Sequence, residues 1–146
     1  MTEMSKAETR RFIMQGTFTG KLATVKKDGS SHVVPIWFVL DDTNSEAGLC
    51  DIIFTTGSES IKAKNIHRNK LVSICIDDQI PLFSFVTIFG TAKIFPYRQK
   101  EILKWATKIA EEKRNAEAIG RWNSGEGSVL IRIKPTRILA EKNITA

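Results

Sequence analysis

The sequence predicts a mainly β protein, built as a small closed or partly open barrel of six antiparallel strands with two or three peripheral helices. Six β-prone runs lie along the 146 residues, and most successive runs are joined by a turn or a short loop. Antiparallel neighbours need only such connections, whereas a parallel sheet would need a helix after nearly every strand. Six strands with so few helices fit a small barrel. No linker or internal repeat divides the chain, so we expect residues 1–146 to form one domain.

In the first part of the chain we expect a helix and the two strands of a hairpin, over residues 5–15, 18–26 and 32–40. Ser5 is placed as the N-cap of the helix, with Glu8 at the matching position of a capping box. The two strands flank Asp28-Gly29, which is a strong short-range signal for a β-hairpin. Pro35 cannot donate a hydrogen bond to a neighbouring strand, so the second strand should lie at a sheet edge or be bulged there.

The middle of the chain predicts a polar loop, a strand, a short helix and a further strand, over residues 41–48, 49–56, 58–69 and 71–76. Ser58 or Glu59 is expected to begin the helix, and Asn69 to end it. Ile61 and Ile66 are expected to pack inward against the sheet.

The remaining chain predicts a long strand, a long helix and a last strand, over residues 83–95, 98–119 and 128–134. Gly90 indicates a bulge or bend in the long strand. Ile102, Trp105 and Ile109 form one apolar stripe at helical spacing, the pattern of a helix that packs on a core. Pro135 is expected to stop the last strand.

The composition is that of an average soluble globular protein, with 42% hydrophobic and 26% charged residues. No apolar run approaches the roughly 20 residues that a membrane span needs. The first residues carry no apolar signal core, so we expect a cytoplasmic protein. Cys50 and Cys75 are too few for a disulfide framework or a four-ligand zinc site, and we interpret both as reduced core residues.

The net charge of +6 favours an anionic partner such as a phosphorylated cofactor, a nucleic acid or a membrane surface. The simpler interpretation is a basic solvated surface. The sequence holds no glycine-rich nucleotide loop, nucleophile elbow or His-Glu-x-x-His motif. His32 and His67 are far apart and nothing identifies carboxylate companions, so they are interpreted as packed or surface residues and no metal site is expected.

Hydroxyls and lysines gather where a predicted strand passes into the short helix: Thr55, Thr56, Ser60, Lys62 and Lys64. A helix start exposes unpaired N–H groups and the positive end of the helix dipole, and these side chains add further donors. The stretch therefore predicts a phosphate site. The alternative is ordinary helix capping with solvated lysines.

A second candidate is the apolar stretch around Pro35, whose irregular backbone would lay main-chain N–H and C=O groups against a flat heterocycle. It comprises Val33, Val34, Pro35, Ile36, Trp37 and Phe38. An ordinary core strand would have the same composition, so both interpretations stay open at this point.

A series of short blocks stands in order along the chain: Leu22-Ala-Thr-Val25, Asp28-Gly29-Ser30, Val33-Val-Pro-Ile-Trp-Phe38, Phe54-Thr-Thr56, Ser60-x-Lys62-x-x-Asn65 and Val72-Ser-Ile74. With this order and spacing the chain resembles the FMN-binding split β-barrel proteins related to pyridoxamine 5′-phosphate oxidase. The resemblance runs from about Gly20 to Ala92, and more loosely to Pro135. It implies a six-stranded split barrel and a homodimer with two FMN sites across the dimer interface.

The resemblance also implies roles for particular residues. Residues 33–38 match the family strand whose main chain borders the flavin ring, and Thr55 and Thr56 match a strand end that contacts the cofactor. Phe85 stands where the oxidases place a cofactor-contacting glutamine. Trp105 and Trp122 are candidates to reach the site from the partner subunit.

Ser60, Ile61 and Lys62 match the family's Ser-Arg-Lys phosphate motif. Ile61 replaces the arginine, so one phosphate contact is lost unless Lys64 compensates. Pyridoxamine phosphate oxidation itself is not expected. The oxidases' Tyr-Phe-x-Ser-Arg-Pro-like segment and C-terminal arginine motif are missing, and Phe38 stands in place of a substrate-binding lysine.

We therefore expect an FMN-binding oxidoreductase that transfers a hydride to or from an unidentified small molecule, in which the cofactor supplies the chemistry. The first alternative is a reductase of the same fold that depends on the deazaflavin coenzyme F-420. The second is a non-enzymatic flavin- or nucleic-acid-binding module. Nucleic acid is the poorer candidate partner, because the aromatic residues have few of the basic neighbours that base stacking needs.

Overall fold

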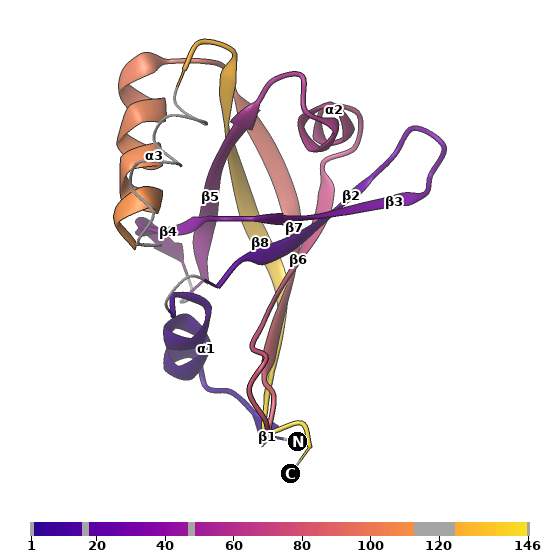
Figure 1. Ribbon diagram of the computed structural model, residues 1–146, viewed down its shortest axis with the longest axis vertical. Helices are drawn as coiled ribbons and strands as arrows, with labels where there is room; N and C mark the ends of the chain where they lie inside the picture. The colour runs from indigo at the N-terminus through magenta and orange to yellow at the C-terminus, as the bar shows by residue number, and fades with distance from the viewer. Residues whose placement is uncertain (1, 16–17, 47–48, 113–124, 146) are drawn as a thin grey trace.

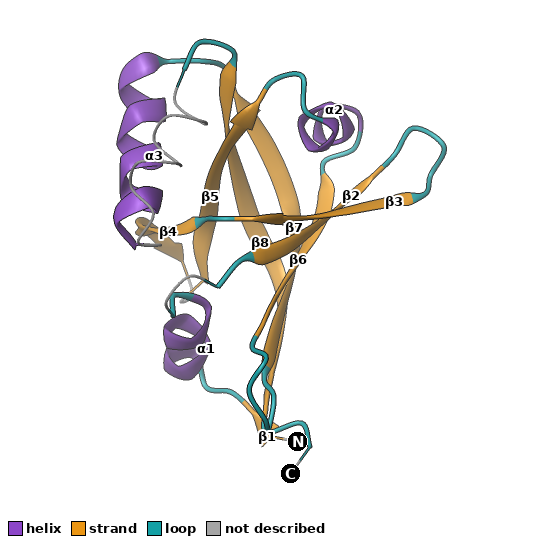
Figure 2. Cartoon of the chain, viewed as in Figure 1, coloured by secondary structure: helices purple, strands orange, loops and turns teal. Residues whose placement is uncertain are grey.

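The computed structural model describes residues 2–15, 18–46, 49–112 and 125–145. This part of the chain contains three helices and eight strands (Figures 1 and 2). In order they are β1 (Thr2–Glu3), α1 (Lys6–Ile13), β2 (Gly20–Val25), β3 (Ser31–Ile36), β4 (Val39–Glu46), β5 (Leu49–Gly57), α2 (Ile61–Arg68), β6 (Leu71–Asp77), β7 (Phe85–Phe95), α3 (Gln99–Glu112) and β8 (Ser128–Lys142). None of these helices is long and apolar enough to cross a membrane.

The strands form one sheet in which every pairing is antiparallel. Its order is β3-β2-β6-β7-β8-β5-β4, and β1 pairs with β8 outside this path. β3 and β4 lie at opposite edges, and no ladder joins them within the described residues, so the sheet is not closed. The mainly β, antiparallel class is confirmed. The predicted count of six strands is wrong, because the sheet has eight.

One of the extra strands comes from the apolar run of residues 32–40. This run contains most of β3 and the start of β4, which Trp37 and Phe38 separate. Trp37 packs against the cluster beneath α3, whereas Phe38 is fully buried in the main core. Two adjacent side chains thus anchor the chain as it passes from one sheet edge to the other. The loop expected over residues 41–48 is β4 as far as Glu46.

β8 is longer than expected, because it continues beyond Pro135. Phe89 pairs with Arg137 and Gly90 with Pro135, so Thr136 is the extra residue of a bulge. Pro135 therefore lies where the ladder is already irregular, a position that tolerates proline. A Cβ at Gly90 would lie 2.5 Å from a backbone carbonyl oxygen of β8, which explains the glycine. The bulge predicted at Gly90 is confirmed, and the stop predicted at Pro135 is wrong.

Several local features match the predictions. Ser5 and Glu8 form the predicted capping box at the start of α1. Gly29 has a φ of 89° in the turn between β2 and β3, a conformation that favours glycine. Pro35 lies in the edge strand β3, where its missing N–H is tolerated. Residues 113–119, predicted to continue the third helix, lie outside the described residues.

The hydrophobic core forms two clusters on opposite faces of β5. The larger includes side chains of α1 and α2, and the smaller lies between α3 and the strands β4, β5 and β8. Trp105 is buried in the smaller cluster of its own chain, and Trp122 lies outside the described residues. Cys50 and Cys75 are both half-buried thiols, so they lie at the margin of the core rather than inside it.

Candidate functional site

The end of β5 and the start of α2 are joined by hydrogen bonds centred on Ser60, the N-cap of the helix. Thr56 Oγ1 donates to Ser60 Oγ at 3.2 Å, and the backbone N–H of Ala63 donates to the same oxygen at 3.2 Å. The N–H groups of Ile61 and Lys62 remain without an acceptor inside the helix, at its positive end. The Ile61 side chain is 57% exposed, so the prediction that it packs inward is wrong. Ile61 brings only its backbone donor to the junction.

The two candidate lysines of α2 differ in their surroundings. Lys62 is half-buried, and burial lowers the pKa of its ammonium group. No carboxylate pairs with it in the described part of the chain. Lys64 has a 57% exposed side chain and pairs with Glu59 at 3.3 Å, a weak surface contact. A half-buried charge without a counter-ion favours an anion beside it, so Lys62 is the stronger candidate for a phosphate ligand.

A buried polar contact holds α2 against β2. Asn65 Nδ2 donates to Thr24 Oγ1 at 2.9 Å, and Arg68 donates to Asn65 Oδ1 at 2.6 Å. Lys62 and Asn65 are three residues apart and share one face of the helix. Thr24 pairs with His32 across the β2–β3 ladder, so this face of α2 is directed toward the first residues of β3.

His32 is a residue that the sequence did not single out for the site. Its Nδ1 is buried and has no hydrogen-bond partner among the residues described. Its ring lies on the same sheet face as the side chain of Thr24, because directly opposed residues share a face. A buried ring nitrogen without a partner is a group that a ligand can satisfy. The burial of His32 Nδ1 could not be predicted from the sequence, because it depends on the β2–β3 register and on the packing of α2 against β2.

The structure divides the predicted ring-binding stretch into two parts. Residues 33–35 lie on the edge strand β3, with Val33 61% exposed. Ile36 and Phe38 are buried in the main core, and Trp37 packs on the smaller cluster. The main chain of residues 33–35 is therefore available at an edge, while the rest of the stretch matches the alternative of an ordinary core segment.

Thr55 and Phe85 lie apart from the junction. Thr55 alternates with Thr56 along β5 and points to the α3 side, where its Oγ1 has no partner in the described part of the chain. Phe85 is the first residue of β7. The last residue of β7, Phe95, is the one beside the end of β5, because Phe95 and Thr55 both pair with Leu130 of β8. The two ends of β7 are about 33 Å apart at about 3.3 Å per residue. One chain therefore does not bring Phe85 to the junction.

A pocket of about 330 Å³ opens beside α2 on the side of β7 and β8. Lys64, His67 and Arg68 line it from the helix, so α2 presents a second basic surface next to the junction. The residues described contain no group of three or more His, Cys, Asp or Glu that could hold a metal ion. The chemistry available at the junction is thus that of anion binding by backbone N–H groups and ammonium groups.

An open, antiparallel sheet of eight strands with three helices in the described residues defines a small, mainly β protein. The chain belongs to the pyridoxamine 5′-phosphate oxidase family, whose profile matches residues 5–142. The resemblance drawn from the sequence blocks is thereby confirmed.

Individual relatives agree with this family. A 5a,11a-dehydrotetracycline/5a,11a-dehydrooxytetracycline reductase from Streptomyces rimosus subsp. rimosus is 33% identical over 87 residues, 56% of this chain and 58% of that protein. The chain thus spans little more than half the length of this relative. The conserved hypothetical protein Rv2991 from Mycobacterium tuberculosis superposes with a TM-score of 0.78 and 23% identity, over 98% of this chain and 89% of the other. An F420 reductase superposes with a TM-score of 0.67 and 22% identity, over 90% and 96%. The two structural likenesses show a shared fold.

Proposed function

We propose that this protein is an oxidoreductase that binds FMN at the junction of β5 and α2 and transfers a hydride to or from a small molecule. The observation that carries the proposal is the half-buried charge of Lys62, which lies at a helix start and has no counter-ion among the described residues. The donors at this position match the needs of a phosphate monoester. Family membership and the reductase relative support the reaction class.

Bound FMN would supply the hydride chemistry, while the protein holds and orients the cofactor. The N–H groups of Ile61 and Lys62, with the Lys62 ammonium group, would hold the phosphate. Lys64 would have to break its surface pair with Glu59 to add a further charge. The outer edge of β3 at residues 33–35, which pairs with no further strand in the described part of the chain, would lie along the ring. A site of this kind needs no acid–base pair of its own for hydride transfer.

We infer a homodimer from the outer face of the sheet. Val33 and Phe89 lie in one row across β3, β2, β6 and β7, as the ladder pairs show. Leu71 and Leu139 lie two residues from this row along their strands and share its face. All four side chains are exposed, and an exposed apolar patch of this kind favours an interface. Phe85 shares the face, so a second copy seated here would be needed to bring it to a cofactor.

The first alternative is a reductase that depends on the deazaflavin coenzyme F-420. The basic pocket beside α2, lined by Lys64, His67 and Arg68, favours the anionic tail of that coenzyme. One structural neighbour is an F420 reductase. A non-enzymatic flavin-binding module is the second alternative, and it differs from both in binding a cofactor without turnover.

Titration of the purified protein with FMN, riboflavin and coenzyme F-420, followed through the fluorescence of each ligand, tests the proposal. Riboflavin has the ring of FMN and lacks the phosphate, so FMN should bind at least about tenfold more tightly. Equal affinities for FMN and riboflavin would exclude a phosphate contact at the junction. Tighter binding of coenzyme F-420 would select the first alternative. Bleaching of bound FMN by a hydride donor such as NADPH then separates an enzyme from a module that only binds.

A further inference from the structure

His32 has the features of a side chain that contacts a ligand. Its Nδ1 is buried and has no hydrogen-bond partner among the residues that the structure describes. The residue as a whole is half-buried, so part of it remains open to solvent. A buried polar atom without a partner costs free energy unless water or a ligand satisfies it. This position therefore favours a ligand that offers a polar group to Nδ1.

A short series of contacts leads from His32 to the helix of the proposed phosphate site. His32 and Thr24 are directly opposed in the β2–β3 ladder, so their Cβ atoms lie about 5 Å apart on one face of the sheet. Thr24 Oγ1 accepts a hydrogen bond from Asn65 Nδ2 at 2.9 Å, and Asn65 is buried. Lys62 lies one turn before Asn65 on the same face of α2. Thr24 and Asn65 thus connect His32 with Lys62.

His32 also lies directly before the proposed ring-binding segment. Residues 33–35 follow it in β3, and Val33 points to the opposite face of the sheet because side chains alternate along a strand. The His32 side chain is on the face that α2 covers, as its ladder partner Thr24 shows. In FMN a ribityl chain joins the ring to the phosphate. A cofactor that reaches from the start of α2 to the edge of β3 would therefore bring this chain past His32.

We infer that His32 binds the ribityl chain of the flavin through Nδ1. The inference rests on the proposed function, because it needs a flavin that spans the start of α2 and the edge of β3. A ribityl hydroxyl both donates and accepts hydrogen bonds, so it pairs with Nδ1 in either tautomer of the imidazole ring. The contact satisfies a buried atom and holds the middle of the cofactor. His32 is thus a binding residue in addition to Lys62 and the main chain of residues 33–35.

Fluorescence titration with riboflavin and with lumiflavin tests the inference, because lumiflavin carries a methyl group in place of the ribityl chain. His32→Phe keeps a planar ring and removes the hydrogen-bonding nitrogen, so riboflavin should bind about 3- to 10-fold more weakly. His32→Asn places an amide near the position of Nδ1 and should bind riboflavin within about twofold of the parent. The affinity for lumiflavin should change by less than about twofold in either variant.

Ser31→Ala is the matched control, because Ser31 precedes His32 in β3 and is exposed on the opposite face of the sheet. It should change the affinity for riboflavin by less than about twofold. Circular dichroism confirms that each variant is folded.

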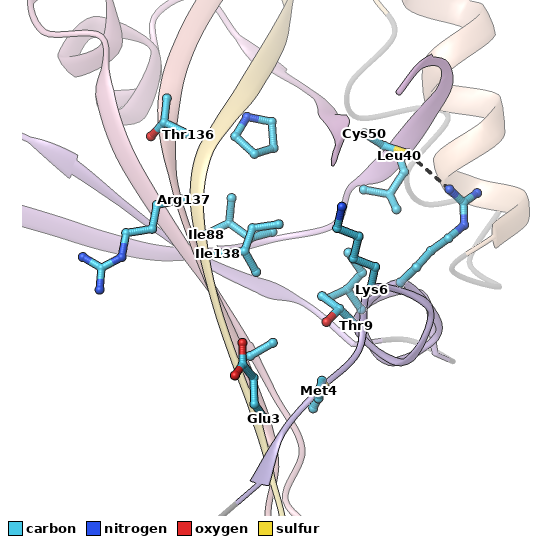
Figure 3. Close-up of a pocket in the computed structure, with 14 residues that line it drawn as sticks. Glu3, Met4, Lys6, Thr9, Leu40, Cys50, Ile88, Thr136, Arg137 and Ile138 are labelled. Carbon is cyan, nitrogen blue, oxygen red and sulfur yellow. Dashed lines mark hydrogen bonds between the residues drawn. The ribbon is translucent and has the colours of Figure 1, made fainter. Parts of the chain in front are cut away.

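Heteronuclear NMR of the imidazole nitrogens tests the same contact without any substitution. The chain has 2 histidines, and the second, His67, is exposed on α2. Riboflavin should shift the nitrogen signal of His32 Nδ1 and leave the signals of His67 unchanged. A pocket of about 360 Å³ between α1 and β8 is the alternative place for a flavin ring (Figure 3). The methyl signals of Ile88 and Ile138, which line this pocket, should therefore also stay unchanged.

The role of His32 is overturned if His32→Phe binds riboflavin as the parent does, or if His32→Asn loses as much affinity as His32→Phe. Equal losses for lumiflavin or in Ser31→Ala would also overturn it, as would NMR shifts confined to His67 or to the pocket isoleucines. A loss with FMN alone would assign His32 to the phosphate instead. A parent that binds neither riboflavin nor FMN would refute the proposed function, and the role of His32 with it.

Discussion

Replacing Lys62 by methionine should weaken the affinity for FMN without lowering the stability of the apo-protein. The side chain is half-buried, and burial lowers the pKa of its ammonium group, so the charge disfavours the folded apo-protein. Methionine keeps an aliphatic side chain and removes the charge. The apo-protein should therefore melt at the same temperature or higher. The lost phosphate contact is worth about 1.5–3 kcal/mol, so FMN should bind about 10- to 150-fold more weakly.

Lys64→Met is the matched control, because Lys64 lies on the same helix but is exposed and paired with Glu59. It should weaken FMN binding by less than about threefold. At neutral pH, fluorescence titration measures the affinity for FMN and scanning calorimetry measures the melting temperature of the apo-protein. The stability difference between Lys62→Met and the parent should shrink at high pH, where the folded parent loses the lysine proton first. Equal affinity losses in the two variants, or a clearly lower melting temperature of Lys62→Met, would refute the reasoning.

Two further predictions concern ion pairs. The hydrogen bond from Lys142 is the main cause that lowers the pKa of Glu8 to about 2. This contact therefore stabilises the fold above the ordinary carboxyl pKa of 4.5, and the stabilisation is lost as the pH falls toward 2. Glu8→Gln should accordingly show a smaller drop in melting temperature between pH 6 and pH 3 than the parent, and an equal drop would contradict the assignment. Arg132 donates to the buried carboxylates of Asp41 and Asp51 at 2.7 and 3.2 Å. Arg132→Met should cost about 2–4 kcal/mol in urea unfolding at neutral pH, somewhat less than a fully buried pair, and a cost below about 1 kcal/mol would show that solvent already screens the carboxylates.

The features predicted correctly from the sequence are those that a few neighbouring residues determine. Gly29 in its tight turn and the capping box of Ser5 and Glu8 depend on residues at most three positions apart. The predictions failed where a distant contact decides the backbone. The sequence of residues 32–40 predicts one strand. The structure divides it into two strands, because Trp37 and Phe38 pack into two different hydrophobic clusters.

In the candidate site too, features set by neighbouring residues could be predicted, and features set by distant contacts could not. The proximity of Thr56, Ser60 and Lys62 could be predicted because one strand end and one helix start place them together. The difference between Lys62 and Lys64 could not be predicted, since it depends on how α2 packs against the sheet. The buried Nδ1 of His32 likewise depends on a strand register and on a helix that begins far along the chain.

β8 has a consequence for the order in which the protein can assemble. This strand lies between β7 and β5, so the block β3-β2-β6-β7 and the pair β5-β4 meet in the sheet only through it. It is also the last of the described strands to leave the ribosome. Until β8 is available, both blocks therefore have unpaired strand edges. Their joining depends on slow, long-range pairing, and the unpaired edges can associate with other chains. Chaperone demand during translation should accordingly fall once β8 has emerged.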